Sequence, residues 1–396
     1  MTRCDKAEAL RQSRCTAIKQ RHCGKAVVLQ QSGRGITEEA SMTEEVYLGI
    51  DTSCYTTSLF FMDSEGHAAA EARRILKVKP GGCGLQQSEM LYQHTRNLPE
   101  LMEAAAQGRR FSVRGIGVSA RPRPREDSYM PAFLAGLGFA RSLAALYGIP
   151  LWQISHQENH LEAALWSANG PDADRFLFLH ASGGTTDLLL AEKENSAYKL
   201  TEIGGSLDLH AGQFVDRVGV ALGLGFPAGP ALEQMAEQHT EIIEIPVSVR
   251  KTKASLSGPC TWVLRKIETS KKEAADLNRA DSVNATEGNT ATATPFADPK
   301  QKAEATEAVS APNLAAGVQW GLAETFVRMI RNGAAEHHVK HAILAGGVCA
   351  NRWIRNHIVE KLAKRGIRVW MPDNRYSGDN ASGCAAYARR QGEHHG

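Results

Sequence analysis

Short apolar runs alternate with amphipathic stretches along most of this chain, which is typical of strands that alternate with helices in an α/β fold. Residues 46–51 and 56–62 predict two strands joined by a polar turn, and residues 88–106 predict a helix behind them. The pattern returns in the second half, where residues 176–179 and 188–190 predict two more strands. A chain of 396 residues is too long for one ordinary core, so two domains are expected.

The composition is that of a folded protein and excludes several other classes. Hydrophobic residues make up 42% of the chain and charged residues 22%, which excludes a wholly disordered, collagen-like or coiled-coil chain. No apolar run approaches the ~20 residues that a transmembrane helix needs, and no apolar leader segment is evident. The cysteines lack a paired metal-binding spacing, which favours reduced thiols. We therefore expect a cytoplasmic protein that makes no membrane contact.

Two polar stretches interrupt the pattern of predicted helices and strands. Residues 1–41 carry a net charge of +4, which leaves −1 for the rest, so any nucleic-acid binding must come from a local patch. Because strand-like sequence begins only after Met42, residues 1–41 are expected to be a disordered or misannotated extension, with Met42 as an alternative start. Residues 267–312 are rich in Ala, Thr, Glu and Lys, with Phe296 as their only aromatic residue, which predicts a disordered insertion.

The strongest local motif is a pair of histidines, His156 and His160, on a predicted helix. If Ser155 caps this helix with Glu158 as its capping-box partner, the two imidazoles lie on one face, where they can share a metal ion. A surface pair is the commoner meaning of this spacing. The residue after His156 is Gln157 rather than glutamate, so the arrangement lacks the general base of a metallopeptidase. Two interpretations remain open here, a metal site and a surface pair.

Glycine-rich turns follow two of the predicted strands. Residues 182–184 are Ser-Gly-Gly, and residues 345–351 are Ala-Gly-Gly-Val-Cys-Ala-Asn in front of a predicted helix. Backbone amides freed by glycine suit nucleotide phosphates, although a tight structural turn needs glycine equally. Two carboxylates lie near comparable turns, Asp216 within residues 204–230 and Asp379 before the last helix. Each is either a residue that holds a helix end or one that binds a ligand.

Taken in order, these motifs resemble the TsaD/Gcp family, once called O-sialoglycoprotein endopeptidases and associated with threonylcarbamoyladenosine formation on tRNA. The resemblance spans about residues 46–390 without the predicted insertion. It rests on the histidine motif 156–161, the Ser-Gly-Gly turn 182–184, the helix motif 204–216, the Gly-Phe-Pro-Ala-Gly-Pro turn 225–230, the Ala-Gly-Gly motif 345–351 and the terminal Asp-Asn-Ala 379–381.

The resemblance implies an actin-like ATPase fold of two ribonuclease-H-like lobes with a cleft between them. We expect an N-terminal lobe over residues 42–152, a C-terminal lobe over 153–379, and a C-terminal helix over 380–396 that returns to the N-terminal lobe. One divalent metal ion, iron or zinc, would be bound by His156, His160 and Asp379, with His180 as a further candidate ligand. The family's threonylcarbamoyl-AMP, or an ATP-like nucleotide, would contact Ser182, Gly183, Gly184, Asp216, Gly229 and Asn351.

The activity implied by the resemblance is transfer of the threonylcarbamoyl group from threonylcarbamoyl-AMP to N6 of adenosine at tRNA position 37. The implied partners are tRNA, a small homologous subunit and an ATPase of the same system. An acyltransferase of this kind is not a peptidase, in agreement with the histidine motif. The alternative is a paralogue of the same family that binds nucleotide and metal but is non-catalytic or has a different specificity.

The chain departs from the family pattern close to the expected chemistry. In the first turn, two acids of the family are replaced by Tyr55 and Thr56, shortly after Asp51, which favours the non-catalytic alternative and leaves the catalytic side chain unassigned. The family's Ser-Gly-Gly-His-Thr-Gln motif ends here in Asp187. An Arg-Pro-rich segment, residues 120–129, replaces the family's Gly-Pro-Gly-Leu loop. Its arginines are either solvated or available to bind phosphate or tRNA.

Overall fold

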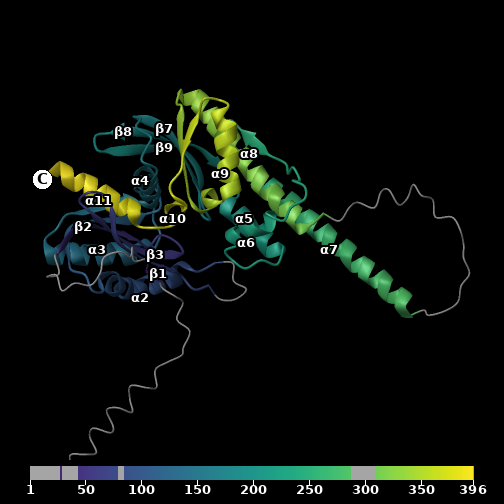
Figure 1. Cartoon of the computed structure of the whole chain (residues 1–396), viewed down its shortest axis with the longest axis horizontal. Helices are drawn as coiled ribbons and strands as arrows, with labels where there is room; N and C mark the ends of the chain where they lie inside the picture. Colours follow the sequence, from purple (N-terminus) through teal and green to yellow (C-terminus); the bar gives the residue numbers. More distant parts are fainter. Residues whose placement is uncertain (1–26, 29–42, 79–83, 287–308, 396) are drawn as a thin grey trace, which may run out of the picture.

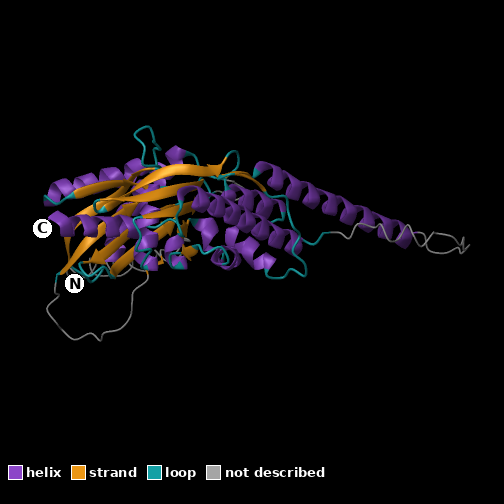
Figure 2. Ribbon diagram, turned by 90° about the horizontal axis from the view of Figure 1, so that it is seen from above, coloured by secondary structure: helices purple, strands orange, loops and turns teal. Residues whose placement is uncertain are grey.

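The computed structural model describes residues 27–28, 43–78, 84–286 and 309–395. They form two β-sheets in two neighbouring lobes, with helices on the faces of both sheets (Figure 1). Figure 2, seen from above, shows the strands enclosed between helices, with one long helix extending away from the body. None of the described helices is long and apolar enough to cross a membrane.

The first sheet has six strands in the order β1-β4-β3-β2-β5-β6. They are β1 (Val27–Val28), β2 (Glu44–Asp51), β3 (Thr56–Asp63), β4 (Ala68–Ile75), β5 (Phe111–Arg121) and β6 (Leu151–Ser155). Strands β2, β3 and β4 form an antiparallel meander, whereas β5 runs parallel to β2 and β6 parallel to β5. The predicted strand pair is confirmed as β2 and β3.

Side chains of β2 alternate between the two faces of this sheet. The helices of this lobe are α2 (Gln87–Ala106), α3 (Phe133–Tyr147) and α11 (Ser382–His395). Val46, Leu48 and Ile50 point to one face, where they share a buried core with α2 and α3. Gly49 points to the other face, which α11 approaches so closely that a Cβ at Gly49 would lie 2.1 Å from the Ala381 carbonyl oxygen.

The second sheet has seven strands in the order β10-β11-β9-β8-β7-β12-β13. They are β7 (Arg175–Ala181), β8 (Thr186–Glu194), β9 (Ala197–Ser206), β10 (Ser248–Arg250), β11 (Lys253–Ser255), β12 (His341–Ala345) and β13 (Arg368–Trp370). Strands β7, β8 and β9 form an antiparallel meander, and β12 and β13 continue the sheet in parallel from β7. The second sheet therefore repeats the order and directions of β2 to β6, as expected for two like lobes.

Helices cover both faces of the second sheet. They are α4 (His156–Ala168), α5 (Ala211–Ala221), α6 (Gly229–Ala236), α7 (Ser257–Thr286), α8 (Ala311–His337), η1 (Gly347–Ala350), α9 (Arg352–Ala363) and α10 (Asn374–Ser377). Leu177 and Leu179 of β7 point into the large core that includes α8. Phe176 and Phe178 point to the opposite face, which α4 covers. Since α4 follows β6 directly, it carries the chain from the first sheet onto the second.

The structure differs from the sequence-based expectation in two polar segments, and we propose to move one lobe boundary. The break expected from residue 267 is helical as far as Thr286, because α7 contains neither Gly nor Pro after Pro259 and still buries Ile267; residues 287–308 lie outside the described part. Within residues 1–41, β1 pairs with β4, and the rest lies outside the described residues. The expected lobe boundary at residue 152 falls inside β6, so we propose to place it after Ser155.

Candidate functional site

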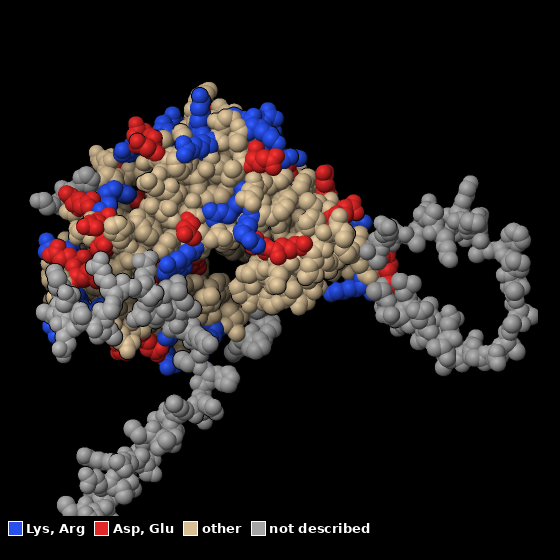
Figure 3. Space-filling view, in the orientation of Figure 1, with Lys and Arg blue, Asp and Glu red and all other residues tan. Residues whose placement is uncertain are grey.

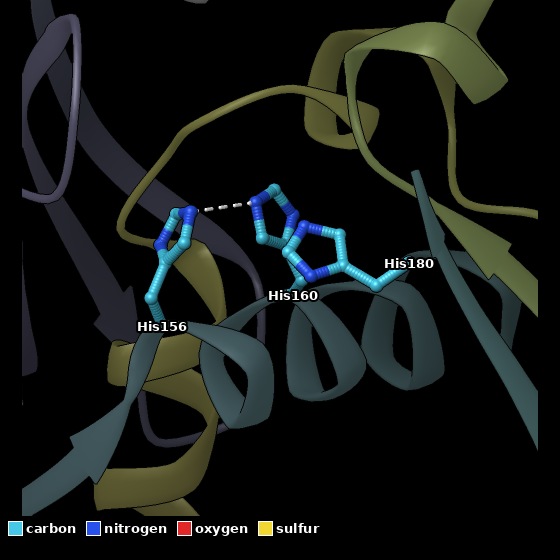
Figure 4. A group of neighbouring side chains, drawn as sticks. All are labelled: His156, His160 and His180. Atoms are coloured by element: carbon cyan, nitrogen blue, oxygen red, sulfur yellow. Dashed lines mark hydrogen bonds between the residues drawn. The ribbon is translucent and has the colours of Figure 1, made fainter. Parts of the chain in front are cut away.

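Helix α4 begins with the capping box that its sequence predicts. The Ser155 hydroxyl accepts a hydrogen bond from the Glu158 backbone N–H, and the Glu158 carboxylate accepts one from the Ser155 backbone N–H at 2.6 Å. This start places His156 and His160 on one helix face with their Nε2 atoms 3.1 Å apart (Figure 4). Both residues are buried, at 6% and 1% exposure, so the surface-pair interpretation is wrong.

A third imidazole, His180, comes from β7. Because strand side chains alternate, His180 points to the same face as Phe178, which is the face that α4 covers. Its ring centre lies 4.5 Å from that of His160 and 5.8 Å from that of His156. One nitrogen of each histidine lies within 4.8 Å of the other two, which is close enough for the three side chains to share a metal ion.

Asp379 reaches the same point from the loop before α11. Its Oδ1 lies 3.6 Å from His156 Nε2 and 3.5 Å from His160 Nε2. The helix-capping interpretation of Asp379 does not hold, because Asn380 Oδ1 accepts the Ser382 backbone N–H at 2.9 Å instead. The carboxylate of Asp379 is therefore directed to the histidines rather than to the helix end.

Asn159 of α4 fixes the position of this loop. Its side-chain amide donates to the Asn380 carbonyl at 2.7 Å, and its Oδ1 accepts the Cys384 backbone N–H at 2.9 Å. A Cβ at Gly383 would lie 1.9 Å from the Asn159 carbonyl oxygen, so α11 and α4 pack in direct backbone contact. One helix thus supplies two imidazoles and the amide that holds the carboxylate-bearing loop against them.

The groups of this cluster perturb one another's protonation. Burial works against a charge on His156, but Asp51 and Asp379 outweigh it and raise the pKa of His156 to about 10. Burial and the charge of His156 lower the pKa of His160, and burial lowers the pKa of His180 well below its usual value. Burial also opposes the charge of Asp379, yet His156 and His160 hold its pKa well below the usual range. A metal ion binds an ionised carboxylate and neutral imidazoles, so Asp379, His160 and His180 are in the required states, and metal binding would displace the proton that His156 holds without it.

Unpaired nitrogens test independently whether a metal ion fits. Both ring nitrogens of His180, and Nδ1 of His156 and of His160, are buried without a hydrogen-bond partner among the described residues. A buried polar atom without a partner is unfavourable. The unpaired nitrogens of His180 therefore favour a metal ion beside the facing Nε2 atoms of His156 and His160, whereas Nδ1 of His156 faces Asp51. Imidazole and carboxylate are common ligands of zinc and iron. The donor set therefore suits the expected metal.

The cluster opens into a cavity of about 410 Å³. Its wall includes Tyr55 from the first turn, Arg123 from the Arg-Pro-rich loop and residues 182–184, together with His156 and Asp379. Figure 3 shows that the molecule is hollowed between the two lobes, with basic and acidic side chains near the rim. The structure thus brings together residues from five separate segments of the sequence.

The Ser-Gly-Gly turn presents its backbone to this cavity. The Ser182 N–H donates to the Thr185 carbonyl at 2.8 Å, and the Ser182 carbonyl accepts the Gly212 N–H at 3.1 Å, which fixes the turn from two sides. A Cβ at Gly183 or Gly184 would meet nothing within 4 Å, whereas one at Gly212 would lie 2.6 Å from Gly183 Cα. The turn is therefore open toward the cavity and tightly supported from behind.

Three residues expected to contact a nucleotide lie elsewhere in the second lobe. Asp216, Gly229 and Asn351 are not among the described residues that form the first cavity. Asp216 accepts the Ala228 N–H at 2.8 Å, and Asn351 caps α9 by accepting the Ile354 N–H at 2.9 Å. Gly229 begins α6, and a Cβ there would meet nothing within 4 Å. A second cavity, of about 330 Å³, lies between α6, α8 and α9.

The first-turn residues occupy different places around the cluster. Asp51 is fully buried at the end of β2, with its Oδ1 3.7 Å from His156 Nδ1, so it lies behind that imidazole. Tyr55 lines the cavity, and its ring meets that of Phe226 with 5.9 Å between the ring centres. Thr56 begins β3 and is not part of the cavity wall as far as the structure describes it.

The two residues after His156 are engaged away from the cluster. The Gln157 amide donates to Asp187 Oδ2 at 2.6 Å, while the Glu158 carboxylate closes the capping box. The same Asp187 oxygen also binds Arg123. The sequence analysis missed this contact because 64 positions separate Arg123 from Asp187; the available signal was that both positions depart from the family pattern.

Comparison with known proteins connects this geometry to a family. The family model described as TsaD, tRNA N6-adenosine threonylcarbamoyltransferase, matches residues 78–386. This chain belongs to the TsaD family. A tRNA N6-adenosine threonylcarbamoyltransferase of Crocosphaera subtropica is 29% identical to this TsaD-family chain over 352 residues, which cover 86% of this chain and 90% of that protein. The protein of the same name from Ralstonia pickettii is 28% identical, over 85% and 88% of the two chains.

A solved structure supports the fold independently of sequence. The crystal structure of full-length HypF in its phosphate- and nucleotide-bound form superimposes with a TM-score of 0.51 and 11% sequence identity. The match covers 90% of this chain and 47% of the HypF chain. A likeness at this identity concerns the fold alone, and together with the two like lobes it confirms the expected actin-like ATPase fold.

Proposed function

We propose that this protein transfers the threonylcarbamoyl group from threonylcarbamoyl-AMP to N6 of adenosine at tRNA position 37, in a metal-dependent reaction. The observation that carries the proposal is the convergence of three buried histidines and Asp379 on a cavity that also exposes the Ser182–Gly184 turn. Membership of the TsaD family and the names of the relatives supply the reaction.

The metal ion of the proposed site is iron or zinc, held by His156, His160, His180 and Asp379. Such an ion would polarise an oxygen of the bound donor and stabilise negative charge that develops during transfer. Asp51 lies behind His156 and orients that imidazole from its far side, as carboxylates next to a metal-binding histidine commonly do. The fit rests on the converging Nε2 atoms of His156 and His160 and on the unpaired nitrogens of His180.

The donor nucleotide would lie along the second lobe. The open turn 182–184 offers backbone N–H groups to its phosphate, beside the histidine cluster. Asp216, Gly229 and Asn351 would contact the adenosine moiety: Asp216 of α5 binds the backbone just before α6, Gly229 begins α6, and Asn351 caps α9. The second cavity lies between α6, α8 and α9. An ATP-like nucleotide would use the same contacts.

The transfer itself is an acyl substitution. The N6 nitrogen of adenosine attacks the carbamoyl carbon, the new N–C bond forms, the bond from that carbon to the phosphate oxygen breaks, and AMP leaves while N6 loses one proton. The chain's own contribution is to hold the donor anhydride against fixed donors in a partly enclosed cavity, where positioning lowers the barrier. The proposed partners are tRNA, a small homologous subunit and an ATPase, and the proposed location is the cytoplasm.

The proposal is tested by incubating unmodified tRNA with this protein, threonylcarbamoyl-AMP and the cognate partner proteins. The tRNA is then digested to nucleosides, which are separated and identified by mass spectrometry. We expect threonylcarbamoyladenosine in the complete mixture and none when this protein alone is omitted. Failure to form it in the complete mixture, while a known transferase forms it from the same reagents, would reject the proposed function.

One observation favours a second candidate function, a paralogue that binds nucleotide and metal without transferring the acyl group. Tyr55 stands in the cavity wall where the family pattern has an acid, and its ring lies against Phe226. An aromatic side chain there removes a carboxylate from the wall of the reaction cavity. Nucleotide binding by the purified protein without any transfer in the assay above would support this candidate.

A further inference from the structure

The Arg-Pro-rich loop beside the cavity is held in one conformation. The Pro122 carbonyl accepts the backbone N–H of Gln157 at 3.2 Å, which ties the loop to the first turn of α4. The backbone N–H of Arg123 donates to the Ser128 hydroxyl at 2.9 Å, which closes the loop on itself. Prolines on both sides of Arg123 further restrict its backbone. This arginine therefore starts from a fixed backbone position.

The guanidinium of Arg123 is fixed as well. Its Nε and Nη2 atoms lie 3.1 and 3.0 Å from one oxygen, Oδ2, of Asp187. Asp187 is buried, with 5% exposure, at the beginning of β8, and the Gln157 amide donates to the same oxygen at 2.6 Å. Asp187 thus connects the loop, α4 and the second sheet through one carboxylate. A guanidinium held in this way keeps its geometry when a ligand binds.

Part of the guanidinium remains available. Arginine carries five N–H donors, and no hydrogen bond among the described residues uses those of Arg123 that do not face Asp187. The side chain is partly exposed and lines the 410 Å³ cavity together with the open turn 182–184. The next arginine along the loop, Arg125, also lines the cavity and binds Asp127 through the same two nitrogens. Its ion pair is exposed, with the two side chains 62% and 69% exposed, against 32% and 7% for Arg123 and Asp187.

We propose that Arg123 is a ligand-binding residue for an anionic group of the donor, with Asp187 as its positioning residue. The available donors of Arg123 and the backbone N–H groups of Gly183 and Gly184 would bind the anion from two sides of the cavity. The group is either the phosphate of the adenylate or the carboxylate of the threonyl moiety, which share this chemistry. The inference rests on the proposed function, because that function supplies the anionic donor.

Isothermal titration calorimetry of the metal-containing protein separates the two sources of negative charge. AMP carries the phosphate without the threonyl carboxylate, and N-carbamoyl-L-threonine carries the carboxylate without the phosphate. The Arg123→Met variant should bind one or both probes about tenfold to a hundredfold more weakly than the unaltered protein, the effect of losing a charge-assisted contact. The Arg114→Met variant is the control, because Arg114 pairs with the exposed Glu45 and is not among the described residues that line the cavity. We expect its affinity for both probes to stay within about twofold.

A double-mutant cycle tests the role of Asp187. In the protein that retains Arg123, Asp187→Asn should weaken binding of the affected probe several-fold. In the Arg123→Met variant, the same change should weaken binding by less than about twofold. Equal weakening in both backgrounds would mean that Asp187 acts on the fold and would overturn its positioning role. Circular dichroism on every variant confirms that the compared proteins are folded.

The outcomes also distinguish this inference from the proposed function. If Arg123→Met weakens only AMP binding, Arg123 binds the phosphate. If it weakens only N-carbamoyl-L-threonine binding, Arg123 binds the carboxylate, and if it weakens both, Arg123 contacts both groups. Unchanged affinity of Arg123→Met for both probes, or no binding of either probe by the unaltered protein, overturns the inference. An Arg123-dependent affinity in a protein that forms no threonylcarbamoyladenosine would retain the anion site and reject the transferase.

Discussion

Four side chains define the proposed metal site, and the sequence indicates them with unequal strength. The spacing of His156 and His160 and the capping signal at Ser155 predict a shared helix face, which the structure has. Asp379 and His180 were expected only from the resemblance to the family, because a single aspartate in a loop or a single histidine in a strand does not by itself indicate a metal site. Contacts between residues far apart in the sequence, such as that between Arg123 and Asp187, could be found only in the folded structure.

Replacement of His160 by alanine should remove the metal ion from the purified protein. The imidazole lies at the centre of the cluster, between His156 and His180, so its loss takes away one ligand and leaves a gap beside two others. Metal content per chain is measured by inductively coupled plasma mass spectrometry. His67→Ala is the control, because His67 belongs to an exposed Asp63–Glu65–His67 group that is the rival site. Metal retained in His160→Ala and lost in His67→Ala would refute the buried site.

Asp208 should stabilise the folded protein at neutral pH and lose this effect in acid. Burial opposes its charge, but hydrogen bonds from Ser255, Ser257 and nearby backbone amides outweigh it and lower its pKa. A carboxyl group whose pKa is lower in the folded state contributes stability above its unfolded pKa, about 3.9, and loses it as the pH falls further. Asp208→Asn should lower the free energy of unfolding by about 1 kcal/mol at pH 7.

Urea unfolding at pH 7 and pH 3 measures this difference for the unaltered protein and Asp208→Asn. The gap between the two proteins should shrink at the lower pH. A gap that stays constant or widens would show that the charge of Asp208 is not what stabilises the turn before α7.

At the scale of elements, residue patterns predicted four strands, β2, β3, β7 and β8, and several helices, among them α2 and α4. The apolar runs of β2 and β3 were found because these strands are buried along most of their length, on both faces of the sheet. The prediction of disorder from residue 267 was wrong as far as Thr286, where α7 ends. A polar composition does not prevent a helix that contains no Gly or Pro after its first turn. Short strands such as β10 and β13 carry too few residues for a pattern to show.

The contact between α11 and the first sheet makes a prediction about glycine. A Cβ at Gly117 of β5 would lie 2.0 Å from the Cys384 carbonyl oxygen, so Gly117→Ala must displace α11 and the Asp379 loop that precedes it. We expect a loss of about 1–3 kcal/mol in the free energy of unfolding and weaker metal retention. Gly138→Ala on α3 is the matched control, because a Cβ there meets nothing within 4 Å and alanine favours a helix.

Thermal and urea unfolding of both variants, with metal content measured on the same samples, decides the matter. If Gly117→Ala proves as stable and as metal-replete as Gly138→Ala, the close approach of α11 is not what holds the loop in place.

At the scale of the molecule, one strand topology occurs twice, and the proposed site lies where the two copies meet. Helix α4 starts at the end of the first sheet and packs on the second, while α11 returns from the second lobe to the first. Composition and periodicity predicted an α/β chain of two domains but could not predict this arrangement, which follows from how distant segments pair. The expected architecture came from the resemblance to the family, and the fold comparison confirms it.

The central claim is that the cluster holds one metal ion on which acyl transfer depends. The most direct measurement determines metal ions per chain and threonylcarbamoyladenosine formation on the same sample, before chelation, after chelation, and after the metal is returned. The account predicts about one iron or zinc ion per chain, loss of transfer when that ion is removed, and recovery when it is restored. Full transfer by the metal-free protein would contradict the account.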